Sequence, residues 1–336
     1  MGTAPQSMVL HAPGPASSRP LGLEARPTRA PGAGEVLLQV TACGVCRTDL
    51  QIAEGDLKAR RLPIVPGHQI VGRVVTVGEG VTEVRTGQRV GVGWLASACG
   101  TCRFCQSGRE NLCPHAKFTG WDVDGGYATH AVARASATFA IPDSFGDLDA
   151  APLLCGGIIG YRSLRRSRIE PGQRLGLFGF GASALIAIQI ARHWGCRVFV
   201  YTRSDEERER ARQLGAEWAG GYDDPPPERL DAAVTFAPSG DVVLAALRAC
   251  DRGATVAINA IHLDRIPEFS YDDLWLERSL ASVANYTHDD AREFLALAAE
   301  IPVRTTIDVF DLRDANTALE RLSAGKVRGA AVLRVE

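Results

Sequence analysis

The sequence predicts a two-domain α/β protein, in which a β-rich domain is joined to a doubly wound parallel-sheet domain. The chain has 336 residues, which is roughly twice the length of an ordinary single-core domain. Short β-type runs separated by Gly, Pro and Cys fill the chain up to about residue 150. From about residue 172, strand and helix patterns alternate instead. The two parts of the chain therefore favour different architectures.

The elements of the first part are short strands, such as the runs VLLQV, IVGRVVTV and RVGVGW. The second part opens with a strand RLGLFGF, a helix ASALIAIQIARHW, a strand RVFVY and a charged helix DEERERARQLG. This is a βαβ unit, and DAAVTFA, GATVAINA and SLASVAN predict further buried strands. We therefore expect a Rossmann-type parallel sheet covered by helices.

The pattern changes once more after about residue 290. AREFLALAAEI and DANTALERLSAGK predict amphipathic helices around a strand TTIDVF, and RGAAVLRV predicts a closing strand. We therefore expect residues 1–155 and 291–336 to form one domain and residues 156–290 to form the dinucleotide-binding domain.

Composition and charge exclude several classes of protein. Hydrophobic residues make up 46% of the chain and charged residues 23%, a balance typical of a folded globular protein. The net charge of -2 and the lack of a basic stripe argue against a nucleic-acid partner. No run of about 18 apolar residues is present, and the first 16 residues lack an export pattern. We expect a cytoplasmic protein that acts on a small molecule without a membrane.

Four of the nine cysteines form one cluster with the pattern C-x-x-C-x-x-C-x7-C. Four thiolates on a short loop are typical of a closed, tetrahedral structural zinc site. Four unrelated buried thiols or a four-sulfur iron site are the alternatives, and no redox-partner motif supports the iron site. The cluster consists of Cys99, Cys102, Cys105 and Cys113.

A second group of candidate ligands is spread along the chain. Cys46 lies in CGVCRTDL and His68 in PGHQI, and each by itself is typical of a buried structural residue. However, CGVCRTDL, PGHQIVGRVV, the four-cysteine loop, GRENLC, DGGYATH and APLLCGG follow one another as in the zinc-containing medium-chain alcohol dehydrogenases. The sequence resembles that family along nearly its whole length. The resemblance implies a GroES-like catalytic domain, with a catalytic zinc held by Cys46, His68 and Cys155.

Two thiolates and one imidazole leave the fourth zinc position open for water or substrate. With the four-cysteine site, this makes two zinc ions per chain. The resemblance further implies that Thr48 takes the alcohol proton and that Asp49 orients His68 or the zinc cage. Gln51 stands where the family often has His, and Gln69 where it often has Glu. Both departures change how protons and zinc ligands are exchanged.

A dinucleotide site is indicated by LFGFGASA, which contains G-x-G-x-x-A between an apolar strand and an apolar helix. Gly179 and Gly181 allow the tight turn. The backbone N–H groups of Ala182 and Ser183 then lie at a helix N-terminus, where a pyrophosphate is favoured. A plain strand-to-helix turn without a ligand is the alternative.

Cofactor choice is determined at the end of the second strand of such a domain. Thr202 stands there in place of the acidic residue usual in NAD enzymes, and Arg203 follows it. Because Arg203 is able to pair with a 2'-phosphate, the sequence favours NADP over NAD. A solvated Arg203, or an NAD site that uses Asp205, is the alternative. The resemblance adds five residues near the nicotinamide or the pyrophosphate, namely Asn259, Ala260, Ala284, Arg328 and Arg47.

The sequence therefore predicts a zinc-dependent alcohol dehydrogenase. It would transfer hydride between a primary or secondary alcohol, or its aldehyde or ketone, and a nicotinamide cofactor. The alternatives are an NADPH-dependent aldehyde reductase of the cinnamyl alcohol dehydrogenase kind, and a zinc- and nucleotide-binding scaffold with impaired catalysis. Trp94 and Trp121 are candidates either for the pocket wall or for core packing. The resemblance also implies a homodimer or homotetramer, joined through an edge strand of the Rossmann sheet.

Overall fold

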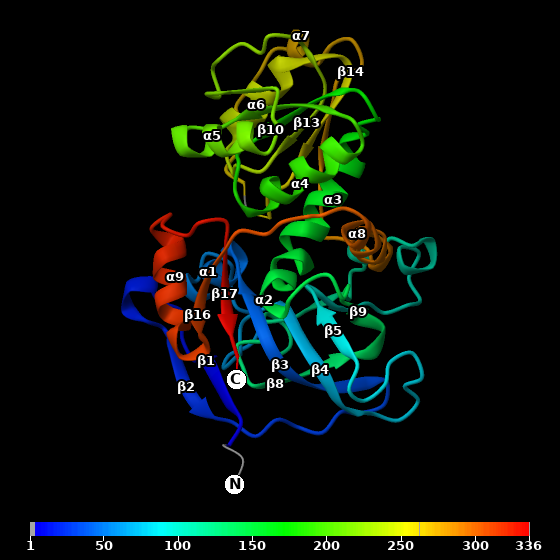
Figure 1. Ribbon diagram of the computed structural model, residues 1–336, viewed down its shortest axis with the longest axis vertical. Helices are drawn as coiled ribbons and strands as arrows, with labels where there is room; N and C mark the ends of the chain where they lie inside the picture. The colour runs from blue at the N-terminus through cyan, green and yellow to red at the C-terminus, as the bar shows by residue number, and fades with distance from the viewer. Residues whose placement is uncertain (1–3, 262, 336) are drawn as a thin grey trace. The chain divides into compact units, whose positions relative to one another are not determined.

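The computed structural model describes residues 4–261 and 263–335, and the chain divides into two compact units. The first unit contains the chain up to Cys155, the segment Asn285–Glu300 and the chain from Arg304 onward. The second unit contains Gly156–Ala284 and the short segment Ile301–Val303. In Figure 1 the first unit carries both the blue and the red parts of the chain.

The first unit is built on a seven-stranded sheet with the order β16-β17-β3-β4-β5-β9, and β8 pairs with β3 as well. The sheet strands are β3 (Glu35–Val45), β4 (Gln69–Val77), β5 (Arg89–Val92), β8 (His130–Arg134), β9 (Thr138–Ala140), β16 (Ile307–Asp311) and β17 (Ala330–Arg334). Two hairpin-like pairs complete the strands, β1 (Gln6–Leu10) with β2 (Leu21–Ala25) and β6 (Leu95–Ser97) with β7 (Lys117–Phe118).

Strand β3 holds this unit together, because it pairs antiparallel with β4, β8 and β17. Its residues alternate between buried and more exposed positions over EVLLQV and are then all buried over ACGV, as expected for a strand that enters the core. Leu333 of β17 faces Cys43 of β3, so the C-terminal part of the chain completes the sheet. Strand β3 ends one residue before Cys46.

The helices of the first unit are short and flank this sheet. The α-helices are α1 (Arg47–Glu54), α2 (Asp147–Ala150), α8 (His288–Glu300) and α9 (Ala315–Ser323). The 3-10 helices are η1 (Ala16–Ser18), η2 (Cys105–Ser107), η3 (Glu110–Leu112), η4 (Ala135–Ala137), η5 (Ala151–Leu154) and η6 (Leu312–Asp314). Helix α1 ends at Gly55, whose φ of 94° is the left-handed conformation that glycine adopts without a steric penalty.

The second unit is a parallel six-stranded sheet with the order β12-β11-β10-β13-β14-β15, which is the doubly wound Rossmann order. Its strands are β10 (Arg174–Phe178), β11 (Arg197–Tyr201), β12 (Trp218–Gly220), β13 (Leu230–Thr235), β14 (Cys250–Ile258) and β15 (Ser279–Ser282). Its helices are α3 (Gly156–Ser167), α4 (Ala182–His193), α5 (Asp205–Gln213), α6 (Gly240–Ala249) and α7 (Tyr271–Leu274).

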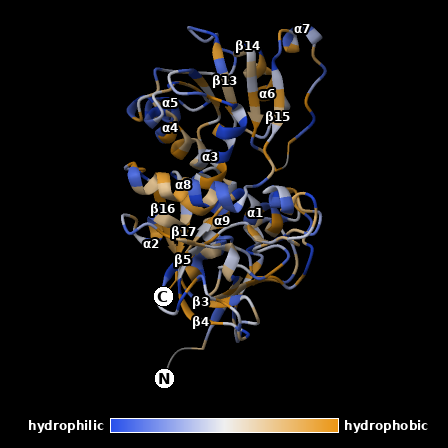
Figure 2. Ribbon diagram, turned by 90° about the vertical axis from the view of Figure 1, so that its right-hand side faces the viewer, coloured by the Kyte–Doolittle hydropathy of each residue, from blue (hydrophilic) through white to orange (hydrophobic). Residues whose placement is uncertain are grey.

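The core of the second unit lies along its central strands, where Phe178, Phe199 and Leu230 are fully buried. Figure 2 shows hydrophobic residues along these strands, whereas α5 is hydrophilic over its length. The burial of the two helices follows their composition. Seven residues of the apolar helix α4 are buried, whereas in the charged helix α5 only Ala211 is buried. Among the helices of residues 4–261 and 263–335, none has the length and apolar character needed to cross a membrane.

The return of the chain to the first unit lies earlier than the sequence pattern indicates. The first unit resumes at Asn285, whereas the pattern places the change at residue 291. Tyr286 explains the difference, because its buried hydroxyl accepts a hydrogen bond from the Leu95 backbone N–H at 3.3 Å, and its ring packs 6.5 Å from the Phe139 ring. The amphipathic pattern of α8 begins only after this anchor.

Candidate metal centres and cofactor site

Three candidate ligands that are far apart in the sequence meet in the first unit. The ligand atoms of Cys46, His68 and Cys155 all lie within 4.8 Å of one another. Cys46 follows β3, His68 precedes β4, and Cys155 follows η5. Sulfur ligands about 2.3 Å from a tetrahedral zinc would lie roughly 3.8 Å apart, so this donor set fits one zinc ion.

The start of helix α1 orients the Cys46 thiol. Cys46 is the residue before the helix, and its Sγ accepts a hydrogen bond from the Thr48 backbone N–H at 3.4 Å. In return, Asp49 Oδ2 accepts a hydrogen bond from the Cys46 backbone N–H at 2.8 Å. This is a capping box in which the usual Ser or Thr is replaced by Cys. The same contacts that begin the helix therefore fix the direction of the sulfur.

His68 is held between Asp49 and Cys46. Its Nδ1 lies 3.0 Å from Asp49 Oδ1 and its Nε2 lies 3.3 Å from Cys46 Sγ. The side chains of His68 and Asp49 are each only 1% exposed, so solvent does not compete for these contacts. Donation from Nδ1 to the carboxylate leaves Nε2 free to bind a metal, as is usual for histidine ligands.

The ionisation of these buried groups is strongly coupled. The hydrogen bond with Cys155 and the charge of His68 hold the pKa of Cys46 well below its usual range, against burial. The same hydrogen bond, together with burial, raises the pKa of Cys155. Burial opposes a charge on His68, but Cys46 and Asp49 overcome it and raise the pKa of the imidazole. The thiolate form is thus favoured at Cys46 and the thiol form at Cys155, and a divalent cation is the partner that would allow both to ionise.

Thr48 lies in the first turn of α1 and is buried. Gln51, one turn further along α1, is half-buried. Gln69 is buried and packs over Gly44, where an added Cβ would lie 2.7 Å from Gln69 Cδ. The glycine before Val45 therefore makes room for the amide that follows His68.

An aromatic stack begins beside His68. The Trp94 ring lies edge-on to His68 with centroids 4.8 Å apart, and it stacks on Phe118 at 5.1 Å and on Trp121 at 5.8 Å. The Arg60 guanidinium lies 3.8 Å from the Trp121 ring centroid. The sequence analysis missed Phe118 and Arg60, because no local pattern connects residue 60 with residues 118–121. We call Trp94, Phe118, Trp121 and Arg60 the aromatic stack.

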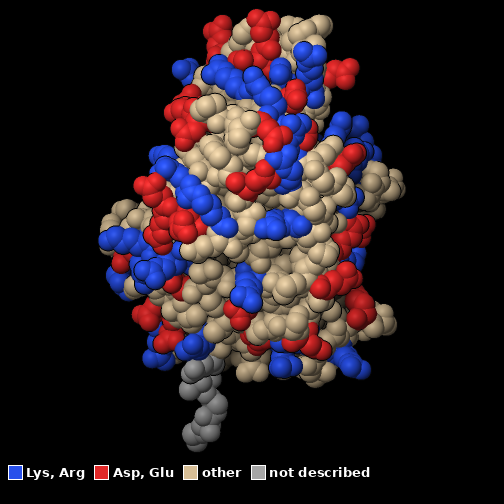
Figure 3. Space-filling model, turned by 45° about the horizontal axis from the view of Figure 1, so that its top comes forward, with Lys and Arg blue, Asp and Glu red and all other residues tan. Residues whose placement is uncertain are grey.

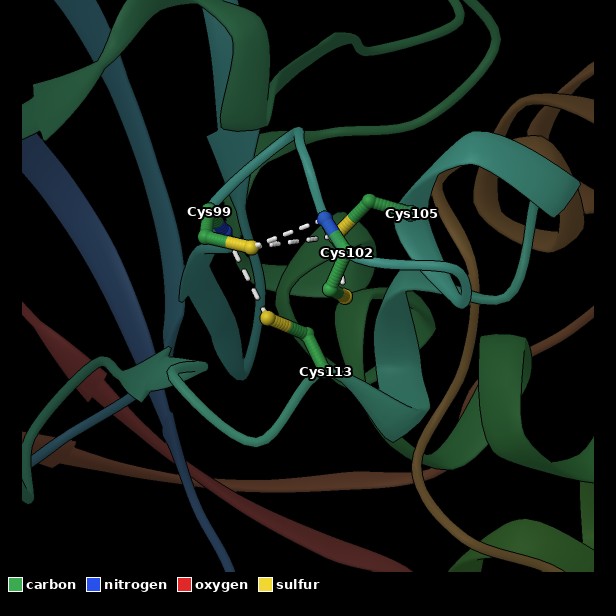
Figure 4. Close-up of side chains that lie close together, drawn as sticks. All are labelled: Cys99, Cys102, Cys105 and Cys113. Atoms are coloured by element: carbon green, nitrogen blue, oxygen red, sulfur yellow. Dashed lines mark hydrogen bonds between the residues drawn. The ribbon is translucent and has the colours of Figure 1, made fainter.

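The four clustered cysteines also converge. Their sulfurs lie within 4.8 Å of one another, and Figure 4 shows all four side chains pointing to one centre. Cys102 Sγ is 3.5 Å from Cys105 Sγ, which is 3.9 Å from Cys99 Sγ. These separations match the spacing of roughly 3.8 Å derived above for a tetrahedral zinc.

The backbone of this loop stabilises thiolates. Cys99 Sγ accepts a hydrogen bond from the Cys102 N–H at 3.4 Å, and Cys113 Sγ accepts from the Cys99 and His115 N–H groups, each at 3.4 Å. Backbone N–H groups lower the pKa of Cys99 to about 5. Desolvation and the neighbouring thiols raise the pKa of Cys105 to about 12. A divalent cation at the centre would favour the thiolate form of all four.

The glycine turn of the second unit lies between β10 and α4. Gly179 has a φ of 93°, and an added Cβ would lie 3.0 Å from the Ala237 backbone nitrogen. Gly181 precedes α4, and an added Cβ there would meet no atom within 4 Å among the described residues. Ala182 and Ser183 form the first turn of α4. The turn therefore places the N-terminus of α4 next to the open space at Gly181, a position that suits a phosphate.

A carboxylate reaches the end of β11 although Thr202 occupies the position of the usual acidic residue. The buried Thr202 hydroxyl donates a hydrogen bond to Glu207, which lies in the first turn of α5. Arg208 donates to the backbone carbonyls of Thr202 and Arg203, each at 3.1 Å. Arg203 itself is exposed, and among the described residues no ion pair includes it. The sequence analysis missed Glu207 and Arg208, because both contacts depend on how α5 folds back.

The remaining cofactor residues lie in both units. Asn259 and Ala260 follow β14 and are half-buried, whereas Ala284, which follows β15, is exposed; all three belong to the second unit. The Asn259 N–H donates to the Thr235 carbonyl at 2.9 Å, which extends the β13–β14 pairing. Arg47 and Arg328 are exposed in the first unit.

Comparison with known proteins identifies the family to which the chain belongs. The family described as Alcohol dehydrogenase GroES-like domain matches residues 32–143, and the family described as Zinc-binding dehydrogenase matches residues 184–300. A probable alcohol dehydrogenase AdhA of Mycobacterium tuberculosis (strain CDC 1551 / Oshkosh) is 47% identical over 329 residues, covering 96% of this chain and 95% of that protein. The chain belongs to the zinc-containing medium-chain alcohol dehydrogenase family.

Several solved structures are similar to this alcohol dehydrogenase over nearly the whole chain. A cinnamyl alcohol dehydrogenase from Sorghum bicolor has 27% identity and a TM-score of 0.89, covering 98% of this chain and 97% of that chain. Acetophenone reductase from Geotrichum candidum, solved in complex with NAD, has 27% identity and a TM-score of 0.87, covering 99% and 98%. The expected fold class and family are confirmed, and the protein is an alcohol dehydrogenase that uses zinc and a nicotinamide cofactor.

Proposed function

We propose that the alcohol is oxidised, or the carbonyl reduced, at the centre formed by Cys46, His68 and Cys155. The observation that carries this proposal is the convergence of two thiols and one imidazole within 4.8 Å. Three protein ligands leave one position of a tetrahedral zinc for the substrate oxygen. The four-cysteine loop offers no such position, so we assign to it a second, purely structural zinc.

Each residue around this centre has a separate task. Bound zinc supplies Lewis-acid chemistry, which lowers the pKa of an alcohol and polarises a carbonyl. Thr48, buried beside Cys46, would relay the alcohol proton, because its hydroxyl oxygen would accept that proton while its own O–H proton passes on. Asp49 holds the His68 ring so that Nε2 faces the ligand cluster. Gln51 does not titrate as histidine does, so the proton leaves through water or the cofactor ribose.

The second unit is proposed as the dinucleotide-binding domain and the first unit as the catalytic domain. In the second unit the pyrophosphate would lie on the N–H groups of Ala182 and Ser183, beside Gly179 and Gly181. The nicotinamide would lie near the residues that follow β14 and β15, namely Asn259, Ala260 and Ala284. The family resemblance adds Arg47 and Arg328 as pyrophosphate contacts.

NADP is proposed in preference to NAD. The exposed guanidinium of Arg203 follows Thr202 directly and is unpaired among the described residues. It is therefore available to a 2'-phosphate. The carboxylate of Glu207 accepts from the Thr202 hydroxyl beside this position, and its negative charge opposes a 2'-phosphate, so the choice of NADP rests on Arg203.

A second candidate function is the reduction of aromatic aldehydes. The aromatic stack starts against His68, and aromatic side chains favour contact with aromatic ligands. The likeness to a cinnamyl alcohol dehydrogenase is consistent with this substrate class. A faster reaction with cinnamaldehyde or benzaldehyde than with short aliphatic aldehydes would distinguish it from a general alcohol dehydrogenase.

We further propose a homodimer or homotetramer joined through β15, one edge of the six-stranded sheet. Next to this edge in sequence, Tyr271 and Trp275 are 65% and 55% exposed. Large aromatic rings so exposed are typical of an interface. A monomeric mass in light scattering would contradict the proposed oligomer.

The nine cysteines form no disulfide, which fits a reducing compartment, so we propose the cytoplasm as the location of the protein.

The test of the catalytic proposal combines metal analysis with a cofactor-linked assay. The wild-type protein should contain about two zinc atoms per chain and should oxidise alcohols with formation of NADPH or NADH. Cys46→Ser should retain about one zinc and lose the activity. Cys196→Ser, a buried thiol of the second unit, is the matched control and should retain both. Full activity in a protein without zinc would overturn the proposal.

A further inference from the structure

The aromatic stack is joined to the candidate metal centre at one end. The Trp94 ring lies 4.8 Å from the His68 ring, and it stacks on the Trp121 ring with an interplanar angle of 18°. The Thr119 N–H donates to the Trp94 carbonyl at 2.9 Å, which binds the segment that carries Trp121 to Trp94. A substrate whose oxygen is bound beside His68 therefore has stacked aromatic rings as neighbours.

The Trp121 ring is held by residues 58–61, a segment that is neither helix nor strand. The indole Nε1–H of Trp121 donates to the Lys58 carbonyl at 3.0 Å. The Arg60 guanidinium lies over the same ring, 3.8 Å from its centroid, a distance at which a cation is attracted to the face of an aromatic ring. One residue therefore fixes the edge of the indole and another covers its face.

The Arg60 guanidinium is itself fixed by Asp122. Arg60 Nη1 donates to both oxygens of the Asp122 carboxylate, each at 3.2 Å. Asp122 Oδ2 also accepts from the Phe118 N–H at 2.9 Å, so the carboxylate connects Arg60 to the backbone of the stack. The guanidinium is therefore restricted to a position over Trp121.

The stability of the fold does not account for this arrangement. The Arg60 side chain is 45% exposed, and an ion pair so exposed contributes little because water and salt screen it. The neighbouring Arg61 forms a similar ion pair with Asp124 at 2.9 Å, but it lies over no aromatic ring among the described residues. What distinguishes Arg60 from Arg61 is its contact with a ring of the stack that begins at His68.

We propose that Arg60 is a positioning residue of the substrate site, which holds the Trp121 ring nearly parallel to Trp94 and thereby makes the enzyme favour aromatic over aliphatic alcohols. A flat substrate gains contact with rings that are already ordered, whereas a short aliphatic chain gains little. The inference rests on the proposed function, because the substrate oxygen must bind beside His68. It deepens that function by naming a residue that sets the substrate class.

The test compares kcat and KM of the holoenzyme for benzyl alcohol and for n-butanol. Arg60→Ala should raise the KM for benzyl alcohol roughly fivefold, the size expected for the loss of one cation–ring contact. The KM for n-butanol and both kcat values should stay nearly unchanged, because Arg60 orders a ring and does not touch the reacting atoms. Arg61→Ala removes the neighbouring ion pair with Asp124; it is the matched control and should behave as the wild type.

Circular dichroism tests the position of the ring without any substrate. Two tryptophan rings as close as Trp94 and Trp121, whose centroids are 5.8 Å apart, should give an exciton band in the far ultraviolet. The part of the band that Trp121→Phe removes belongs to this pair. Arg60→Ala should weaken that part and Arg61→Ala should leave it unchanged. A full band in Arg60→Ala would show that the ring keeps its place without Arg60, and would overturn the inference.

A double-mutant cycle tests the route of the effect. In a Trp121→Ala background, Arg60→Ala should change the KM for benzyl alcohol little further, because the ring on which it acts is gone. Effects that multiply would overturn the inference, as would an unchanged KM for benzyl alcohol in Arg60→Ala or equal increases for both alcohols.

The wild type separates this inference from the proposed function. A wild-type enzyme that oxidises both alcohols equally well would overturn the inference and leave the proposed function intact. A zinc-saturated wild type that oxidises neither alcohol with either cofactor would overturn the proposed function, and the inference with it.

Discussion

Asp49 and His68 form a buried pair, with Asp49 Oδ1 and His68 Nδ1 3.0 Å apart. The other oxygen of the same carboxylate accepts from the Cys46 N–H at 2.8 Å. One side chain therefore orients two of the three candidate zinc ligands. Burial, and after it the charge of Cys46, raise the pKa of Asp49 against the opposite effect of His68, so these contacts offset only part of the cost of keeping the carboxylate charged.

The first prediction concerns this carboxylate. Asp49→Asn keeps the size of the side chain but removes its charge and leaves only one acceptor oxygen, so His68 and the Cys46 N–H can no longer both be satisfied. We expect zinc affinity at the catalytic centre to fall 10- to 100-fold and kcat to fall with it. Chelator titration of the holoenzyme measures the affinity. The exposed Asp56→Asn is the control, and an unchanged zinc affinity in Asp49→Asn would contradict the assignment.

The second prediction separates the structural zinc from the catalytic one. Cys102→Ser removes a ligand from the loop between β6 and β7 without touching Cys46, His68 or Cys155. We expect the loss of about one zinc per chain and of about 2 kcal/mol or more of unfolding free energy, equivalent to a Tm lower by about 4–8 °C. Activity at low temperature should survive. Calorimetry, metal analysis and a cold assay test this together, and immediate loss of activity with an unchanged Tm would argue against a structural role.

Local patterns in the sequence were sufficient where the functional unit is local. The four cysteines and the turn from Gly179 to Ser183 each lie within one short segment, so residue spacing alone predicts which atoms converge. The alternation of strands and helices likewise predicted the parallel sheet of the second unit. In these cases the backbone geometry of a few consecutive residues determines which local structure forms.

Contacts between distant segments could not be predicted from residue spacing. Cys46, His68 and Cys155 are separated by 22 and 87 residues, and only the family resemblance suggested that they meet. Glu207 and Arg60 make tertiary contacts that no spacing rule describes. The return to the first unit was placed too late because Tyr286 is held by burial and one hydrogen bond, which leave no periodic signal.

The third prediction addresses cofactor choice. If Arg203 pairs with the 2'-phosphate, Arg203→Ala should raise the KM for NADPH about tenfold, the effect of losing one charge-assisted contact of about 1.4 kcal/mol, and should leave the KM for NADH nearly unchanged. Arg210→Ala, which removes a surface ion pair with Glu206 on the same helix, is the control. Equal changes for both cofactors would place Arg203 outside the phosphate site.

The fourth prediction concerns pH and His288, the first residue of α8. Its ring packs 5.9 Å from Phe139, its Nδ1 lies 3.9 Å from Glu110, and its Nε2 has no partner among the described residues. Burial lowers the pKa of His288 below 6.5, and this outweighs the opposite effect of Glu110. The folded protein therefore resists a proton that the unfolded chain accepts near pH 6.5.

Because the unfolded state binds more protons in this range, stability from His288 is complete above pH 6.5 and is lost as the pH falls below it. His288→Gln lacks this contribution, so the free energy of unfolding should fall less between pH 7.5 and 5.5 in the variant than in the wild type. Urea unfolding at fixed free zinc measures both slopes, with the exposed His193→Gln as the control. If the wild type instead gained unfolding free energy relative to the variant as the pH falls, folding would raise the pKa of His288. Glu110 rather than burial would then govern its charge.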